Sequence, residues 1–398
     1  MGWLGLDDTD SLSGGCTTEV FHRLLNELPT GTRVGQPRLI RLWPFAQRRT
    51  RGNAALAVEL DVEDTTSLLE HLDRWWTSNI FPLAGSVQPS DISSRKQSPA
   101  SPGMVWFDEK PDSSFYWAAV RGDVTDLPLP PASRRWGGHG CIGASAAVAW
   151  PAMEVTWEAI AWRQSGANGP RSVDESALNI VDGLSEIVFC RDPRRGKQLV
   201  APRGVSPVLF GIRALTLESA SHGCLTLLEA EGTEATAGWR VFETNQASGD
   251  HLEGTLPGTV EKVSIDPVRK HVTLTLQGKA VVKVFAEGGP VNALARWLKP
   301  GDTIEVRGLR HPDGSLHAEQ MRCVDAAPRA VERPLCSACG RRMKSMGANQ
   351  GVRCPGCKLR AEDAWVDVPS TPPYDGWVEP NVDGRRHLAR PLSWSKTP

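Results

Sequence analysis

The paired cysteines near the C-terminus constrain the fold of this chain more than any other feature. Cys336 and Cys339 form one CxxC motif, and Cys354 and Cys357 form a second one after fourteen intervening residues. Two such motifs bring four thiolates within reach of one tetrahedral ion, which predicts a structural zinc ribbon. The alternative is a redox pair, but redox sites normally use one CxxC motif beside a βαβ unit. With four protein ligands the zinc would have no open position for catalysis.

Length and composition favour a multi-domain protein that is not embedded in a membrane. A chain of 398 residues should divide its hydrophobic core among several units. It has no apolar run near the roughly 20 residues of a membrane helix, and its first residues lack a signal-peptide pattern, so we expect a cytoplasmic location. The net charge of -1 means that any nucleic acid would have to be bound by local basic patches.

Hydrophobic periodicity predicts mixed α/β domains followed by a small barrel. Leu4 to Leu6 is typical of a short buried strand, and apolar residues recur at helical spacing from Val20. Between 256 and 326, five alternating runs and one helical insert predict an OB-type barrel, although another small β-barrel fits the same count. The expected units are an α/β domain (1–150), an α+β domain (151–252), the barrel (256–326), the ribbon (333–363) and a basic tail (364–398).

Three carboxylates crowd the end of the first predicted strand. Such crowding is costly unless a cation neutralises it, and hard oxygen ligands suit Mg²⁺ that bridges the phosphates of a nucleotide. The glycines and the helix start that follow are suited to receive phosphate oxygens. Singly, Asp and Ser here would be ordinary turn and cap residues. The cluster comprises Asp7, Asp8 and Asp10 with Ser11, Gly14, Gly15, Thr17 and Thr18.

Basic and histidine residues elsewhere are further candidates for phosphate binding. Arg51 and Asn53 end a stretch rich in arginine, which can clamp phosphate, although a solvated basic loop explains it almost equally well. His139 lies among glycines and can act as an acid or base, but a packed histidine is the alternative. For RNA phosphates the candidates are Arg341, Arg342 and Lys344 on the ribbon with Arg385 and Arg386 in the tail, where a solvated surface is the alternative.

Together these motifs resemble the archaeal isoleucine-tRNA agmatidine synthetase family over nearly the whole chain. The order of the motifs carries the resemblance, because no single one is decisive. The motifs are Gly5 to Ser11 with Cys16 to Thr18, Thr50 to Asn53, Ser206 to Arg213, Phe242 to Gln246, the barrel followed by the ribbon, and Arg385 to Leu388.

The resemblance implies a kinase-like N-terminal domain, a ferredoxin-like domain, an OB-fold and a zinc ribbon. It implies an ATP-dependent ligase that joins agmatine to C2 of the wobble cytidine in the CAU-anticodon isoleucine tRNA, which allows AUA to be decoded. Asp7, Asp8 and Asp10 would position Mg²⁺ and ATP, and Thr17 aligns with the family's autophosphorylated threonine. Arg49 and Ser101, like His139, depart from the residues common in the family.

A second function class is compatible with the same modules. It is a non-catalytic RNA- or DNA-binding protein with an OB-fold, a zinc ribbon and a nucleotide-binding N-terminal domain. Such a module has no need of three crowded carboxylates beside a phosphate loop, which favours the enzyme. No motif indicates a membrane or an obligate protein partner.

Overall fold

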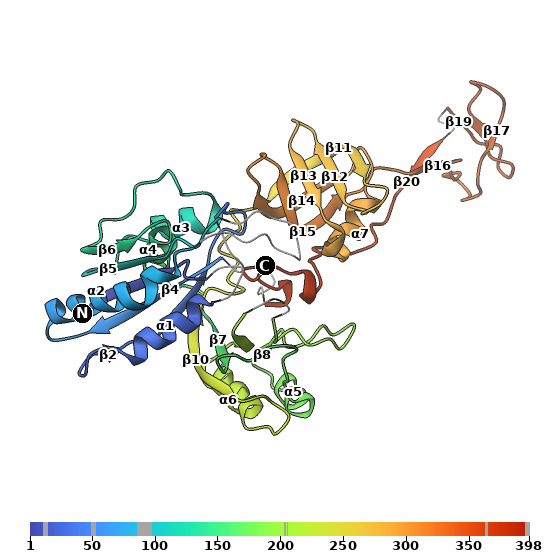
Figure 1. Ribbon diagram of the computed structural model, residues 1–398. Coiled ribbons are helices and arrows are strands. Elements are labelled where there is room, and N and C mark those ends of the chain that lie inside the picture. The colour runs from blue at the N-terminus through green and yellow to red at the C-terminus, as the bar shows by residue number, and fades with distance from the viewer. Residues whose placement is uncertain are drawn as a thin grey trace. The chain divides into compact units, whose positions relative to one another are not determined.

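The computed structural model describes residues 1–10, 15–48, 53–85, 98–202, 204, 206–362 and 365–394. The chain forms two compact units, Met1–Glu253 with Asn381–Pro398, and Gly254–Pro380 (Figure 1). The second unit is therefore inserted between the main part of the first unit and its C-terminal segment.

A ten-stranded sheet forms the centre of the first unit. Its strands follow the order β6-β5-β1-β4-β3-β10-β7-β9-β8, and β2 pairs with β4. All neighbours are antiparallel except β3 and β10, whose parallel pairing joins an N-terminal half to a second half. The strands are β1 (Gly2–Asp7), β2 (Arg33–Val34), β3 (Arg38–Arg41), β4 (Ala54–Asp61), β5 (Gly103–Phe107), β6 (Arg134–Gly137), β7 (Thr156–Arg163), β8 (Ile187–Val188), β9 (Val208–Ala214) and β10 (Thr236–Thr244).

Helices cover both faces of the N-terminal half because its central strands are apolar on both sides. In β1, Leu4 and Leu6 pack against α1 (Thr17–Asn26) and α2 (Thr65–Trp75), as the two-residue period of a strand requires. The opposite face packs against α3 (Ser114–Arg121) and α4 (Cys141–Ala149). There α4 lies so close to β1 that a Cβ on Gly5 would be 2.6 Å from the Ala144 carbonyl oxygen.

The second half of the sheet has its own core and receives the C-terminal segment. Helices α5 (Glu175–Asp182) and α6 (Leu217–Leu228) pack on β7 and β9 around Leu178, Phe210 and Leu227. The returning segment is fixed by backbone hydrogen bonds from Ala247 to His387 and from Gly249 to Leu388, each 2.8 Å long.

The second unit contains a closed five-stranded barrel, which confirms the five strands and one helix predicted from the sequence. The barrel core is built mainly from Val, Leu and Ile side chains of alternating strand positions. Its strands are β11 (Leu256–Ile265), β12 (Val272–Leu276), β13 (Val281–Val284), β14 (Thr303–Arg310) and β15 (Leu316–Asp325), with α7 (Pro290–Trp297) between β13 and β14.

A small metal-binding module follows the barrel in the same unit. The antiparallel pair β16 (Ala330–Glu332) and β20 (Val366–Val368) brings the two ends of this module together. Between them lie β17 (Lys344–Ser345), β18 (Val352–Arg353) and β19 (Arg360–Ala361), which form a three-stranded sheet. Among the described residues of either unit, no helix is long and apolar enough to cross a membrane.

Candidate active site and zinc site

A cavity of about 400 Å³ lies within the first unit and is lined by both halves of its sheet. The N-terminal half contributes the end of β1, the start of α1 and residues near α4. The second half contributes β7, β9 and the segment before β9. His387, from the returning C-terminal segment, completes the lining. Since residues from four distant parts of the sequence converge here, this cavity is the candidate active site.

The three predicted carboxylates lie on the cavity wall where β1 ends. Asp7 is the last residue of β1, and one of its carboxylate oxygens accepts the backbone N–H of Asp8 at 2.7 Å. Asp8 has a left-handed φ of 58°, which turns the chain out of the strand. Its carboxylate accepts the backbone N–H of Ser101 at 2.9 Å. Asp10 lines the same wall.

Burial makes this group of acids electrostatically unfavourable without a cation. Burial raises the pKa of Asp7 well above its ordinary value, and the neighbouring charge of Asp8 raises it further. Burial also raises the pKa of Asp8 to about 7. The close approach of Gly143 contributes to this burial, because a Cβ there would lie 1.9 Å from Oδ2 of Asp7. Carboxylate oxygens are the ligands that Mg²⁺ accepts, so the chemistry of these side chains suits this ion.

The two predicted threonines lie at the start of α1, and both are buried in the wall of the same cavity. Thr17 is the first residue of the helix. The Thr18 hydroxyl accepts a hydrogen bond of 3.1 Å from the indole N–H of Trp162 in β7 and lies 2.9 Å from the Cys16 sulfur. Cys16 precedes the helix in an extended conformation without a side-chain cap. The helix start therefore retains the partial positive charge that attracts phosphate.

The structure brings two of the other predicted phosphate-binding residues to this cavity. Asn53 lines the wall, where its side-chain amide donates to the Trp43 carbonyl at 2.6 Å. His139 lines it too, and its backbone N–H donates to the Ser101 hydroxyl at 3.0 Å. Burial, with the charge of Arg48 second, lowers the pKa of His139. Gly15 is exposed and precedes α1, whereas Ser11, Gly14 and Arg51 lie outside the described residues.

A buried ion cluster on the cavity wall was missed by the sequence analysis. Glu158 of β7 is only 4% exposed and lies 3.3 Å from Arg41 of β3 and 3.4 Å from Arg213 of β9. His387 shares this part of the lining, and the charge of Arg41 lowers the pKa of His387 well below its ordinary value. The motifs that carry the family resemblance include Arg213 and His387, but nothing in the spacing of these residues places them together.

The predicted RNA-binding cations are divided between the two units. Arg385 and Arg386 are partly buried in the first unit, where their guanidinium groups lie over the rings of Phe189 and Phe45 at 5.7 and 4.9 Å. In contrast, Arg341, Arg342 and Lys344 are exposed in the second unit. The C-terminal end of the predicted basic tail is therefore packed in the first unit, which contains the cavity.

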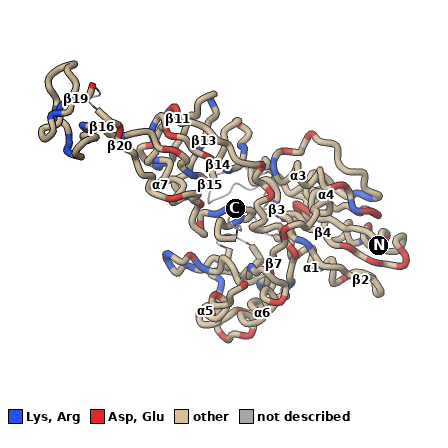
Figure 2. Tube along the Cα trace, turned by 180° about the vertical axis from the view of Figure 1, so that it is seen from behind, with Lys and Arg blue, Asp and Glu red and all other residues tan. Residues whose placement is uncertain are grey.

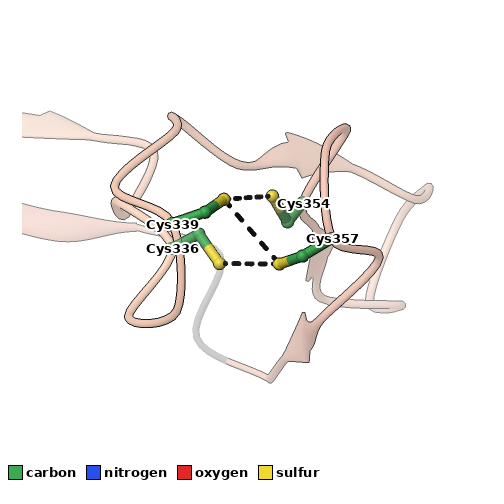
Figure 3. A group of neighbouring side chains, drawn as sticks. All are labelled: Cys336, Cys339, Cys354 and Cys357. Atoms are coloured by element: carbon green, nitrogen blue, oxygen red, sulfur yellow. Dashed lines mark hydrogen bonds between the residues drawn. The ribbon is translucent and has the colours of Figure 1, made fainter.

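The four predicted zinc ligands converge in the second unit (Figure 3). The sulfur of Cys336 lies 3.3 Å from that of Cys357, and the sulfur of Cys339 lies 3.4 Å from Cys354 and 3.7 Å from Cys357. Four thiolates around a zinc ion with bonds of about 2.3 Å are separated by roughly 3.8 Å, so the group fits tetrahedral zinc with little adjustment. A backbone N–H of Ala338 lowers the pKa of Cys336, which favours the thiolate.

Comparison with known proteins extends over the whole chain. Residues 3–67 match the TiaS TCKD domain, residues 138–251 match the TiaS FLD domain, and residues 333–366 match the TiaS C-terminal zinc ribbon domain. The isoleucine-tRNA 2-agmatinylcytidine synthetase TiaS of Methanosarcina acetivorans is 31% identical over 98% of this chain and 96% of its own length. The chain belongs to the TiaS family. TiaS of Archaeoglobus fulgidus is 29% identical over the same shares of the two chains.

Solved TiaS structures share the complete architecture. The chain covers 98% of apo TiaS with a TM-score of 0.75 at 26% identity, and the TiaS structure covers 100% of this chain. TiaS in a complex with its isoleucine tRNA and ATP gives the same coverage and TM-score at 27% identity. The match to the family's zinc ribbon and the convergence of the four sulfurs together confirm the predicted ribbon.

Proposed function

We propose that this chain is an isoleucine-tRNA 2-agmatinylcytidine synthetase. It would use ATP to join agmatine to C2 of the wobble cytidine in the CAU-anticodon isoleucine tRNA. The relatives over nearly the full length carry this name, and one solved relative binds the isoleucine tRNA with ATP. The observation in this chain that carries the proposal is a cavity that three carboxylates and the start of α1 line together.

The acidic end of the cavity is suited to bind the phosphates of ATP. Asp7, Asp8 and Asp10 would hold Mg²⁺, which neutralises phosphate charge and polarises the transferred phosphoryl group when bound. The start of α1, with the partial positive charge of a helix N-terminus, would receive phosphate oxygens. His139 and Asn53 line the same cavity and would contact the nucleotide there.

The reaction requires a site that activates the wobble cytidine for attack by the amine. The C2 oxygen of cytidine is a poor leaving group, so it would be phosphorylated before the amine of agmatine attacks C2. Phosphoryl transfer depends mainly on positioning and on electrostatic stabilisation, which buried and fixed groups provide. Thr17 at the first position of α1 would serve as the phosphate acceptor seen in the family.

The domain assignment follows the same reasoning. We propose a kinase-like catalytic domain in residues 1–150, a ferredoxin-like domain in 151–252, an OB-fold in 256–326 and a zinc ribbon in 333–363. The element order β7-α5-β8-β9-α6-β10, with the four strands side by side as β10-β7-β9-β8, supports the ferredoxin-like assignment. The closed barrel with one helix before its fourth strand supports the OB-fold.

The direct test is mass spectrometry of the wobble nucleoside after incubation of the protein with ATP, agmatine and CAU-anticodon tRNA. We expect a mass gain that corresponds to 2-agmatinylcytidine and that depends on all three substrates. A tRNA with another base at the wobble position is the matched control and should stay unmodified. Tight tRNA binding without any product would instead favour a non-catalytic nucleic-acid-binding protein.

A further inference from the structure

A basic hairpin projects from the first unit between β8 and β9. Its two arms pair through a bridge between Arg191 and Gln198, and the Leu199 N–H donates to the Cys190 carbonyl at 2.7 Å. The hairpin extends beyond α5 in Figure 1, and Figure 2 shows Lys and Arg gathered on this segment. It lies outside the basic regions that the sequence analysis singled out.

The base of the hairpin and its turn are held by specific bonds. Asp192 is 1% exposed, and its carboxylate accepts the backbone N–H and the guanidinium of Arg194 at 3.0 and 3.1 Å. Arg194 also bonds Asp383 of the returning C-terminal segment at 2.5 Å. On the same arm as Asp192, Arg191 bonds Glu175 of α5 at 2.7 Å. These two arginines are therefore structural anchors, and the hairpin is a fixed element of the unit.

The two cations at the turn have no such anchoring role. Arg195 and Lys197 are exposed, and within the described part of the chain neither forms an ion pair. Gly196 between them has a φ of 63°, which closes the turn. The residues of the turn thus present two exposed cations without an ion pair on a rigid support, with Pro193 as the apolar neighbour.

The hairpin continues directly into the wall of the catalytic cavity. Leu199, Val200, Ala201 and Pro202 line the cavity, and the Val200 carbonyl accepts the N–H of Gly211 in β9 at 2.9 Å. Arg171 fixes the next turn, because its guanidinium donates to the carbonyls of Pro202, Gly204, Ser206 and Val208 at 2.7 to 3.0 Å. An extended chain rises about 3.3 Å per residue, so the turn stands roughly 10 Å from the cavity wall.

We propose that this hairpin, through Arg195 and Lys197, binds the backbone phosphates of the unpaired RNA loop whose nucleotide enters the cavity. The inference rests on the proposed function, which places a tRNA wobble nucleotide there. Phosphates of the adjoining nucleotides lie within such a distance of an inserted base. Contacts of this kind fix the position of the strand and carry no sequence information, so base recognition stays with the cavity.

An RNA strand is favoured over other anionic partners by the position of the hairpin. Two cations beside a substrate-binding cavity lie close to the backbone of the substrate that is bound there. In the proposed function this substrate is RNA, whose backbone is a polyanion. An acidic protein would require a broader complementary surface with apolar anchors, whereas the turn offers charge and almost no apolar area. A single-stranded loop also exposes its phosphates to a narrow projecting turn.

The experiment compares wild type with the double variant Arg195→Ala/Lys197→Ala, using a CAU anticodon stem-loop RNA as the binding probe. Loss of two phosphate contacts with a single-stranded loop should reduce the slope of log affinity against log salt by about 1.4. In the modification assay KM for tRNA should rise several-fold while kcat at saturation stays unchanged. The charge-retaining variant Arg195→Lys/Lys197→Arg should restore both values. Arg23→Ala/Arg74→Ala removes two exposed cations from α1 and α2 and is the matched control.

Different outcomes separate this inference from the proposed function. A wild-type salt slope and KM in the double variant would overturn the hairpin assignment. An effect with full-length tRNA but none with the stem-loop would also overturn it, because the contact would then lie elsewhere on the RNA. The measurement of stem-loop binding is made without ATP and without agmatine. A wild-type protein that binds the stem-loop through the hairpin yet modifies no tRNA would therefore contradict the proposed function alone.

Discussion

The indole N–H of Trp162 donates a hydrogen bond of 3.1 Å to the hydroxyl of Thr18, and this bond joins the two halves of the large sheet. Trp162 lies in β7 of the second half and is 1% exposed, whereas Thr18 lies in the first turn of α1 on the N-terminal half. The bond fixes one of the two adjacent threonines at the cavity. Thr18 is thereby engaged as a structural acceptor, which leaves Thr17 as the candidate for phosphate transfer.

The first prediction separates the two threonines. Thr17→Ala should abolish transfer of radiolabel from γ-labelled ATP to the protein, because the accepting hydroxyl is removed. Thr18→Ser keeps the acceptor of the Trp162 bond and should retain the label. Autoradiography of the purified variants after incubation with ATP measures both. Equal labelling of Thr17→Ala and wild type would show that another residue accepts the phosphate.

The second prediction concerns Asp8 and joins activity to stability. In the folded chain its pKa is about 7 instead of the ordinary 3.8, so the folded state binds the extra proton between these two pH values. The free energy of unfolding therefore falls as the pH rises from 3.8 to about 7. At pH 8 without metal, Asp8→Asn should raise Tm by about 2–4 °C, which corresponds to roughly 1 kcal/mol in a domain of this size. Asparagine also tolerates the left-handed φ of 58°.

The same variant should lose ATP-dependent modification by about 100-fold or more, because one of the carboxylates that would hold Mg²⁺ is removed. Its affinity for tRNA should stay within a few-fold of wild type. The exposed Asp375→Asn, in the second unit, is the matched control and should change neither Tm nor activity. Full activity of Asp8→Asn would remove this carboxylate from the mechanism.

The third prediction tests the zinc site. Purified protein should contain about one zinc ion per chain, and Cys336→Ser/Cys354→Ser should lose it, since each CxxC motif then lacks one thiolate. Elemental analysis measures the metal content. Cys224→Ser, at a buried position in α6 of the other unit, is the control for loss of a cysteine and should retain the ion. Wild-type protein without zinc would contradict the assignment.

The fourth prediction concerns the pH dependence of stability through His22. Burial, with the charge of Arg240 second, lowers the pKa of His22 to about 4, and the Arg240 guanidinium donates to its ring at 3.0 Å. An unfolded histidine titrates near 6.5, so between about 6.5 and 4 the unfolded state binds the extra proton. Stability therefore falls as the pH drops through this window.

Replacing His22 by Gln should flatten the decline of Tm with falling pH over that range. Thermal unfolding at half-unit pH steps measures the slope. The exposed His222→Gln in α6 is the matched control, for which the wild-type slope should persist. An unchanged slope in His22→Gln would assign the acid sensitivity to other groups.

Local patterns in the sequence were sufficient for the ribbon and the barrel, because each is encoded in neighbouring residues. Cysteine spacing defines one ion site, and alternating residues define strands. The cluster of Glu158 with Arg41 and Arg213 was not predictable in this way. Arg41 and Glu158 are 117 positions apart, and the parallel pairing of β3 with β10 brings their strands into one sheet. Pairing between distant strands leaves no short-range signal.

The C-terminal segment shows the same limit of local reasoning. Its arginines look like a tail that continues the basic ribbon, yet Leu388 is 4% exposed in the core of the first unit. The second unit, Gly254–Pro380, separates this segment from its packing partners along the chain. The basic composition of this segment therefore did not reveal that its Leu388 packs in the core of the first unit.

The last prediction concerns how a chain with a net charge of -1 holds a polyanion. We expect the exposed cations of the ribbon, among them Arg341 and Lys344, to bind tRNA phosphates. Truncation of everything after the barrel would also remove the segment that lines the cavity through His387. The cleaner change is excision of the ribbon alone. Because Ala330 and Val368 are paired in an antiparallel ladder, a short glycine linker between residues 329 and 369 can replace it.

The excised protein should bind tRNA more weakly, and each lost phosphate contact should reduce the slope of log affinity against log salt by roughly 0.7 to 0.9. ATP binding should survive, since every residue that lines the cavity remains. Nitrocellulose filter binding at several salt concentrations measures the slope, and calorimetry measures ATP binding. An unchanged slope would mean that the RNA is held elsewhere, by the barrel or by the first unit, whose basic groups include the arginines between Arg33 and Arg48 and the hairpin at Arg195.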